Sequence, residues 1–365
     1  MASNRSSCDL AGDLASSNGY KLVLSVKIVI CIIGIFIFST FMIFKPIRLW
    51  HHAHARLLAK YHLFSAFILN LGSLAMLIFN LTRLSRNHED PCNYILDAKL
   101  HFWLALVLFF LFFLETVSIL VLSIERTVST ARIVNYENFE SRRSVIFIIV
   151  FVSALLFFAL FFTMLNTPDL SANSGIAIVL STKTFYVRNF LIVLLAIIVV
   201  LGIFTVILCQ VAMLRNIKFR RSFRAGESRS TEPTNRLSAV FQIEENLSMM
   251  RILLPVSYIH LLIVSFSMAG LLIYDLFRKS ENIVFNTIIK EAVLITPLYS
   301  VALPVVLFWH YPDVYWKAMK TLSGQKITKE GRQPSVSVVP VALQRDVHFA
   351  GLRNAFDGPI PKRSR

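Results

Sequence analysis

The sequence predicts an all-α membrane protein, a bundle of seven transmembrane helices with the N-terminus outside and an amphipathic helix after the seventh span. Three observations lead to this prediction. The 365 residues are 56% hydrophobic and only 16% charged, and the mean hydropathy is +0.64, whereas soluble domains carry about 25% charged residues. The apolar residues gather in seven long stretches, and the basic residues gather on one side of them.

Each apolar stretch is long enough to cross a bilayer, whose hydrocarbon core of about 30 Å requires about 20 residues of helix. The stretches are 22–44, 61–81, 101–124, 144–165, 190–214, 252–277 and 292–310. Pro297 and Pro304 interrupt the seventh, which is tolerated where neighbouring helices satisfy the freed carbonyls. No internal repeat is visible, which argues against a transporter.

The Lys and Arg residues of the loops set the orientation. With the N-terminus outside, the inner segments 45–60, 125–143, 215–251 and 311–365 carry 26 basic residues, and the outer segments carry 10. The net charge of +16 is then a positive surface facing the anionic inner leaflet, not a sign of nucleic-acid binding. The chain divides into an extracellular N-terminus (1–21), the seven spans (22–310) and a cytoplasmic tail (311–365) with a short amphipathic helix followed by disorder.

Two of the four cysteines, Cys8 and Cys92, fall on the outer side. They either form a disulfide, which the oxidising outer face permits, or remain two free thiols. Cys31 and Cys209 lie within spans and are expected to act as small apolar side chains. Asn4 begins an Asn-Arg-Ser glycosylation sequon on the outer side.

Four polar residues lie deep in four different spans, each about 12–16 Å from one end of its span: Asn70, Glu115, His260 and Tyr299. Ionisable groups are costly in lipid and mark functional sites. We predict a buried polar layer with two arrangements. The alternative is a protonated Glu115 bonded to a backbone carbonyl, with the other three unrelated to it. Lys27, near the outer end of the first span, is expected to extend its ammonium to the interface.

Glu125 and Arg126 stand where the third span leaves the membrane on the inner side. Arg126 can extend to lipid phosphates, or it can pair with Glu125 or with Glu244 and Glu245 of the sixth span. In the second case the pairs form a latch across the inner face. Opening the latch would let the sixth span swing outward and expose a cleft for a cytosolic partner, a two-state element that an external ligand can bias.

The sequence carries no pattern typical of an enzyme. No GxSxG, HExxH or Walker motif occurs, although these motifs mark hydrolases, metalloproteases and nucleotide-binding enzymes. The run HHAH at 51–54 lies among basic residues and is expected to face anionic lipid. We therefore predict no catalytic residue, no metal site and no cofactor. The alternatives to a receptor are a membrane transporter or a membrane-embedded lipid-modifying enzyme with seven spans.

Two stretches resemble a known family. Residues 124–143 read IERTVSTARIVNYENFESRR, and residues 236–255 read RLSAVFQIEENLSMMRILLP. With the seven spans, they resemble nematode serpentine chemoreceptors of the Sra-type superfamily, most closely the Sre class. Ser129 stands where that pattern usually has Ala. The E/D-R-Y, C-W-x-P and N-P-x-x-Y motifs of rhodopsin-like receptors are absent, and His101 stands where those receptors carry a disulfide cysteine.

The resemblance implies a G-protein-coupled chemosensory receptor in the plasma membrane of chemosensory neurons, which transduces binding of an external small-molecule cue into activation of a heterotrimeric G protein. It implies that Glu125 and Arg126 form the inner switch, with Glu244, Glu245 and Asn246 as the motif of the sixth span. We expect the cue to bind in the outer half of spans three, five, six and seven. The candidate ligand-binding residues are His101, Trp103, Tyr186, Ser267, Tyr274 and Glu291.

Overall fold

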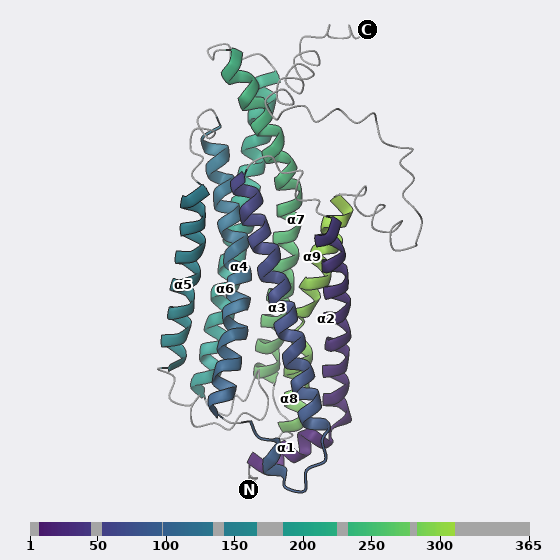
Figure 1. The fold of residues 1–365 in the computed structure, drawn as a ribbon. Helices are drawn as coiled ribbons and strands as arrows, with labels where there is room; N and C mark the ends of the chain where they lie inside the picture. The colour runs from purple at the N-terminus through teal and green to yellow at the C-terminus, as the bar shows by residue number, and fades with distance from the viewer. Residues whose placement is uncertain are drawn as a thin grey trace, which may run out of the picture.

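The computed structural model describes residues 7–44, 53–96, 98–133, 142–165, 185–224, 233–277 and 283–310. Figure 1 shows that they form a bundle of long helices that run side by side along one axis. The elements are α1 (Ser7–Ser16), α2 (Asn18–Phe44), α3 (Ala53–Ser85), the short 3-10 helix η2 (Pro91–Tyr94), α4 (Ala98–Ala131), α5 (Arg142–Leu165), α6 (Phe185–Arg224), α7 (Pro233–Phe277), α8 (Ile283–Val293) and α9 (Pro297–His310).

The seven expected spans correspond to α2 through α7 and to the pair of α8 and α9. Within the described residues, six helical stretches are long and apolar enough to cross a membrane, and α5 adds a shorter apolar stretch, Ile146–Ala159. The predicted fold class, an all-α bundle of seven spans, is therefore confirmed. Asn4 and the tail with its predicted amphipathic helix lie outside the described residues. Below, "outer" means the end of the bundle that carries α1, and "inner" means the opposite end, following the orientation predicted from the charges.

The sides of the bundle carry many exposed large apolar side chains. Ile43 is 70% exposed, Phe147 69% and Leu262 67%. In water, exposed apolar surface costs about 25 cal/mol per Å², but in a bilayer the hydrocarbon itself is the solvent. The same residue types fill the interior, where Phe38 of α2 and Met250 of α7 belong to the largest buried cluster. This explains why the helices lack a polar face along most of their length.

Helices α6 and α7 are much longer than a bilayer requires, with 40 and 45 residues. They pack against each other and project together beyond the other helices at the inner end of the bundle (Figure 1). The basic residues that follow the fifth span and the apolar residues that precede the sixth lie in these extensions. Inside α7, Pro255 occupies a helical position.

The seventh span consists of two helices separated by a short break at 294–296. Pro297 is the first residue of α9, where its missing N–H has no intrahelical partner to lose, so the break precedes this proline. Ser267 of α7 supports the break, because its hydroxyl accepts a hydrogen bond from the Ile295 N–H at 3.3 Å. The span therefore begins in α8, earlier than the predicted residue 292, and an apolar helical stretch runs from Val284 to His310.

A close contact fixes α7 against the end of α8. A Cβ added to Gly270 would lie 2.2 Å from Cγ1 of Val293, well inside the optimal carbon–carbon separation of about 3.5–4.0 Å. We expect Gly270→Ala to destabilise the protein by about 1–3 kcal/mol through overpacking. Adding Val293→Ala to the same chain should recover the lost stability. Thermal unfolding of the purified protein measures both effects.

Gly72 supplies the matched control for this experiment. A Cβ at Gly72 would meet Leu111 at 3.4 Å, an ordinary contact, so Gly72→Ala should be neutral or slightly stabilising, as expected for Gly→Ala inside a helix. Equal melting temperatures for the two alanine variants, or no rescue by Val293→Ala, would show that the contact does not constrain the bundle.

Candidate functional site

Arg126 in the inner part of α4 is a fully buried cation, with 0% of its surface exposed. Its Nε donates to Oε2 of Glu125 at 2.5 Å, and its Nη2 donates to the other oxygen of that carboxylate. Its Nη1 donates to Oδ1 of Asn246 in α7 at 2.8 Å and lies 3.4 Å from the Met249 sulfur. The forked pair with Glu125 compensates the buried charge, and the remaining nitrogen joins α4 to α7.

Asn246 is the point on α7 where several α4 groups converge. Its Oδ1 accepts a hydrogen bond from the Ser129 hydroxyl at 3.2 Å as well as the one from Arg126. Ser129 also accepts from Nε2 of Gln242 at 3.2 Å. Gln242 and Asn246 are one helical turn apart, so they present their amides on the same face of α7. We call Glu125, Arg126, Ser129, Gln242 and Asn246 the inner network.

Helix α6 is tied to the same part of α4. Thr130 donates its hydroxyl to the Arg126 carbonyl at 2.8 Å and accepts from Nδ2 of Asn216 in α6 at 2.7 Å. Both side chains are buried, and Asn216 is 0% exposed. Three helices, α4, α6 and α7, therefore meet through side-chain hydrogen bonds at the inner end of the bundle. A purely apolar interface would instead let the helices slide past one another at little cost.

The two acidic residues beside Asn246 take different positions. Glu244 forms an ion pair with Arg220 of α6 at 2.5 Å, and both side chains are partly exposed, so the pair contributes at most about 1 kcal/mol. Glu245 is buried, with 8% exposed. Glu244 joins α7 to α6 through this pair, and the amide of Asn246 accepts a hydrogen bond from Arg126.

A polar layer crosses the middle of the bundle, and its centre is His62 of α3, which sequence reasoning missed. His62 Nε2 lies 3.0 Å from the Tyr299 hydroxyl, and Nδ1 lies 2.8 Å from the Ser118 hydroxyl. The His260 ring packs edge-on against Tyr299, with centroids 5.0 Å apart. Glu115 is 2% exposed, and its Oε1 has no hydrogen-bond partner among the described residues. The Ser118 hydroxyl bonds the Glu115 carbonyl at 2.6 Å, which connects this residue to the layer.

Asn70, the fourth expected member, makes a different contact. Its Nδ2 donates to the carbonyl of Cys31 in α2 at 3.1 Å. It also lies close to Gly34, where an added Cβ would meet Asn70 Nδ2 at 2.9 Å and the Ser300 hydroxyl at 2.4 Å. Asn70 therefore fastens α3 to α2, whereas hydrogen bonds and ring contacts link His62, His260 and Tyr299 to one another.

A cavity of about 140 Å³ opens in the outer half of the bundle. We call it the outer cavity. Most of its lining is apolar, and side chains from α2, α3, α4, α6 and the broken seventh span contribute. The polar lining residues are Lys27, Ser73, Asn80, Glu291 and Thr296. Among the predicted ligand-binding residues, Glu291 lines this cavity. Most of the lining comes from the second, third and seventh spans, with Lys27 from the first and Leu195 from the fifth.

An ion pair forms part of the wall of the outer cavity. Lys27 Nζ lies 2.5 Å from Oε1 of Glu291, and the two residues are 8% and 5% exposed. The expectation that Lys27 extends to the interface is therefore wrong. Its ammonium points toward α8, which brings the Glu291 carboxylate beside it, and a buried charge of this kind requires an opposite charge.

The other predicted ligand-binding residues are distributed differently. Trp103 is 51% exposed and stacks on Phe161 of α5 with ring centroids 6.0 Å apart, so it lies on the surface of the bundle. Ser267 is buried and holds the break of the seventh span. His101, Tyr186 and Tyr274 belong to α4, α6 and α7, and their side chains lie outside the described part of the structure.

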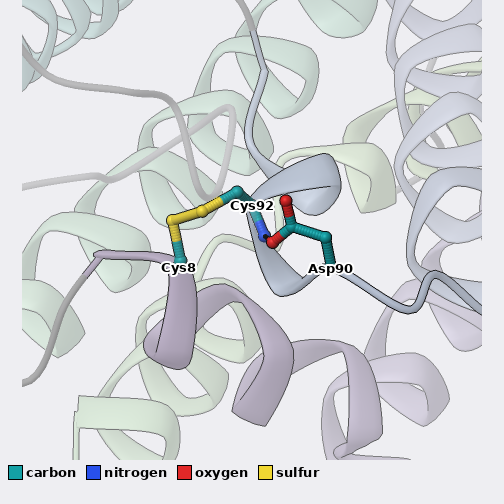
Figure 2. Close-up of a disulfide and its surroundings, with 3 residues drawn as sticks. All are labelled: Cys8, Asp90 and Cys92. Carbon is teal, nitrogen blue, oxygen red and sulfur yellow. Dashed lines mark hydrogen bonds between the residues drawn. A yellow bond between two sulfur atoms is a disulfide. The ribbon is translucent and has the colours of Figure 1, made fainter.

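The outer end of the bundle is covered by α1, which the sequence did not predict as a helix. Figure 2 shows the disulfide between Cys8 of α1 and Cys92 of η2, beside Asp90. Oδ1 of Asp90 caps η2 by accepting from the Cys92 N–H at 2.8 Å. Leu14 of α1 is 1% exposed and belongs to a buried cluster with residues of α2 and α3. The disulfide therefore anchors a helix that is also packed on the bundle.

These groups favour binding and switching over bond-making chemistry. Within the described ranges, no cluster of three or more His, Cys, Asp or Glu side chains is arranged to hold a metal ion. What the chain offers is a mainly apolar cavity at one end, a hydrogen-bonded network between three helices at the other, and a polar layer between them.

A family model for serpentine-type seven-transmembrane G-protein-coupled receptors, class ab chemoreceptors, matches residues 5–331. A search of curated proteins gives no match to this chain. The family match agrees with the resemblance to serpentine chemoreceptors and names class ab, where the two motifs resembled the Sre class. It describes a receptor family and not an enzyme family, and it does not favour a transporter or a lipid-modifying enzyme. The chain belongs to the class ab serpentine chemoreceptors, and it is a multi-pass membrane protein that functions as a G-protein-coupled chemosensory receptor.

Proposed function

We propose that a small-molecule cue binds in the outer cavity and that its binding releases α7 from α4 at the inner network, where a heterotrimeric G protein then docks. The observation that carries the proposal is the buried contact of Arg126 with Asn246. A cation that is 0% exposed and bonded to a second helix favours two discrete arrangements, bonded and separated, over a gradual displacement. A ligand with different affinities for the two arrangements shifts the equilibrium between them.

The polar layer supports transmission between the two ends. It lies between the outer cavity and the inner network, and it joins α3 to the seventh span through His62 and Tyr299. Pro297 and Thr296 line the cavity, and Tyr299 follows them within the next turn of α9. If a bound cue displaces the break of the seventh span, Tyr299 therefore moves with it, because it lies within one helical turn of the break.

The finer assignments belong to the same proposal. We place the receptor in the plasma membrane of chemosensory neurons, with the basic inner segments against anionic lipid and Asn4 as the glycosylated residue. The motifs at 124–143 and 236–255 support a close relation to the Sre class of the Sra-type superfamily. Glu125, Glu244 and Glu245 act with Arg126 and Asn246 in coupling to the G protein.

The test replaces Asn246 by leucine, a residue of similar size that accepts no hydrogen bond. Because Arg126 and Ser129 both lose their acceptor on α7, the separated arrangement gains population, and we expect basal G-protein activation to rise several-fold in cells without any added cue. A panel of volatile and water-soluble molecules should then raise wild-type activity more than it raises the activity of the variant.

Ser248→Leu is the matched control, since Ser248 lies on the same helix and is exposed. It should leave basal activity at the wild-type level with equal surface expression. Basal activity that stays unchanged in Asn246→Leu would contradict the role of the inner network. Solute flux through the wild-type protein without any G-protein activation would contradict the proposed function as a whole.

A further inference from the structure

We propose that the outer cavity binds a small, neutral, mainly apolar molecule with one hydroxyl group, and that this hydroxyl bonds both members of the Lys27–Glu291 ion pair. The inference rests on the function proposed above and specifies the chemical class of its cue. Three properties of the cavity lead to it: its volume, its apolar lining, and the hydrogen-bonding capacity that the ion pair leaves unused.

The volume limits the size of the cue. The cavity measures about 140 Å³, and an engineered apolar cavity of about 150 Å³ in another protein holds a benzene molecule. A molecule of about six to eight non-hydrogen atoms therefore fills the space without displacing helices. Peptides, nucleotides and sterols are too large, which leaves compounds of the size of small volatile molecules.

The lining favours a hydrocarbon body. Leucine, phenylalanine, methionine and proline side chains form most of the wall, including Leu108, Phe109 and Phe112 of α4 and Leu195 of α6. Burying each methylene group of a ligand against such a surface contributes about a threefold to fourfold gain in affinity, the equivalent of about 0.8 kcal/mol. Most of the binding free energy of a small occupant would come from this contact.

The ion pair gives the cavity one strongly polar point. The Lys27 ammonium has three donor hydrogens, and within the described residues its side chain bonds only Oε1 of Glu291. Both residues line the cavity and both are more than nine-tenths buried. Donor and acceptor capacity is thus left over in the wall of a mainly apolar cavity. Buried polar groups of this kind are normally satisfied, and an occupant of the cavity can satisfy them.

The charge of the pair selects among possible polar groups. Lys27 and Glu291 together are neutral, so a charged cue would leave one charge without compensation in a weakly polar surrounding, which is costly. A carbonyl group can accept from Lys27 but offers nothing to Glu291. A hydroxyl group accepts from the ammonium and donates to the carboxylate at once. Among singly substituted molecules of this size, an alcohol therefore matches the pair best.

The test compares four probes that share a six-carbon chain and differ in the end group: 1-hexanol, hexane, hexanoate and hexylammonium. Equilibrium binding of each labelled probe is measured on the purified full-length receptor in lipid nanodiscs, with empty nanodiscs as background. We expect 1-hexanol to bind saturably and at least tenfold more tightly than each of the other three, a difference equal to about 1.4 kcal/mol.

Two double variants examine the ion pair itself. Lys27→Met with Glu291→Leu replaces the pair by apolar side chains, which buried pairs often tolerate without loss of stability, and it should bind hexane and 1-hexanol equally well. Lys27→Glu with Glu291→Lys reverses the pair and should keep the preference for 1-hexanol. Leu262→Ala, at a residue of α7 that is 67% exposed and outside the cavity lining, is the control and should bind like the wild type.

Each other outcome overturns the inference. The inference fails if the wild type binds hexane and 1-hexanol equally or binds either ion more tightly. It also fails if no probe binds saturably, or if the apolar double variant still prefers 1-hexanol. The assay contains no G protein, so it separates this inference from the proposed coupling. If 1-hexanol is not preferred but Asn246→Leu raises basal activity, only the cue class is rejected. If 1-hexanol is preferred but Asn246→Leu leaves basal activity unchanged, only the proposed coupling is rejected.

Discussion

Replacing Arg126 by alanine is expected to reduce the cue-driven increase in G-protein activation at least tenfold, while the receptor still reaches the cell surface. The guanidinium is the group that holds Glu125, Asn246 and Met249 together. Hydrogen bonds to charged groups contribute about 1.5–3 kcal/mol each, so their loss frees α7 from α4 without a cue. Basal activity then rises, as in Asn246→Leu, and the cue adds little to it. The Glu125 side chain is 13% exposed and lies at the inner end of α4, where water can solvate it once its partner is removed.

The measurement is the ratio of cue-stimulated to basal activity, normalised to surface protein detected by antibody. Arg132→Ala is the control at the first residue after α4, because Arg132 is exposed, and it should keep the wild-type ratio. Arg126→Lys keeps the charge but lacks the planar fork, and it should fall between alanine and wild type. A wild-type ratio in Arg126→Ala would rule out Arg126 as the switch.

Removing the disulfide between Cys8 and Cys92 has the largest expected effect on stability. The two cysteines are 84 residues apart in the sequence, and a bridge that closes so long a loop stabilises a protein by about 2–5 kcal/mol. We expect Cys8→Ala with Cys92→Ala to lower the melting temperature of the purified receptor by several degrees. Helix α1 should also lose protection against backbone hydrogen exchange, since ten-residue helices are marginal on their own.

The wild-type receptor treated with a reducing agent provides the comparison. It should melt at the temperature of the double variant, and the reducing agent should leave the double variant unchanged, because Cys31 and Cys209 are free thiols in the interior. If the double variant melts at the wild-type temperature, the packing of α1 on the bundle is sufficient by itself, and the bridge is dispensable for stability.

The spans could be predicted from the sequence because lipid imposes a length and an apolar composition on each of them. Helix α1 could not, since SCDLAGDLAS is short and carries two acidic residues. Its helical structure depends on contacts with η2, α3 and α8, which belong to remote parts of the chain. The break in the seventh span was expected at its prolines. The structure has it just before Pro297, where the Ile295 N–H donates to the Ser267 hydroxyl and to the Val293 carbonyl.

The site residues that sequence reasoning missed are those whose partners lie far along the chain. Sequence reasoning proposed Glu291 as a ligand-binding residue but missed its ion pair with Lys27, which lies 264 residues away in the sequence, because Lys27 by itself looks like a residue of the membrane interface. His62 was overlooked because the predicted span began at residue 61, whereas α3 begins at Ala53 and carries His62 into the bundle. Ser129 did give a signal, since it departs from the family pattern at the position that contacts Asn246.

Because α7 is long, a small bend at Pro255 moves the inner end of the helix over a large distance. Its 45 residues correspond to about 67 Å, more than twice the hydrocarbon core of about 30 Å. Pro255 lacks an N–H and weakens the helix at one point, and the arm from Pro233 to Pro255 is about 33 Å long. A rotation of about 10° at the proline would move Asn246 by about 2 Å, enough to break a hydrogen bond, and the tip of the arm by about 6 Å. The movement of about 2 Å at Asn246 thus becomes a movement of about 6 Å at the far end of α7. The second movement is larger than the radius of the helix backbone, about 2.3 Å.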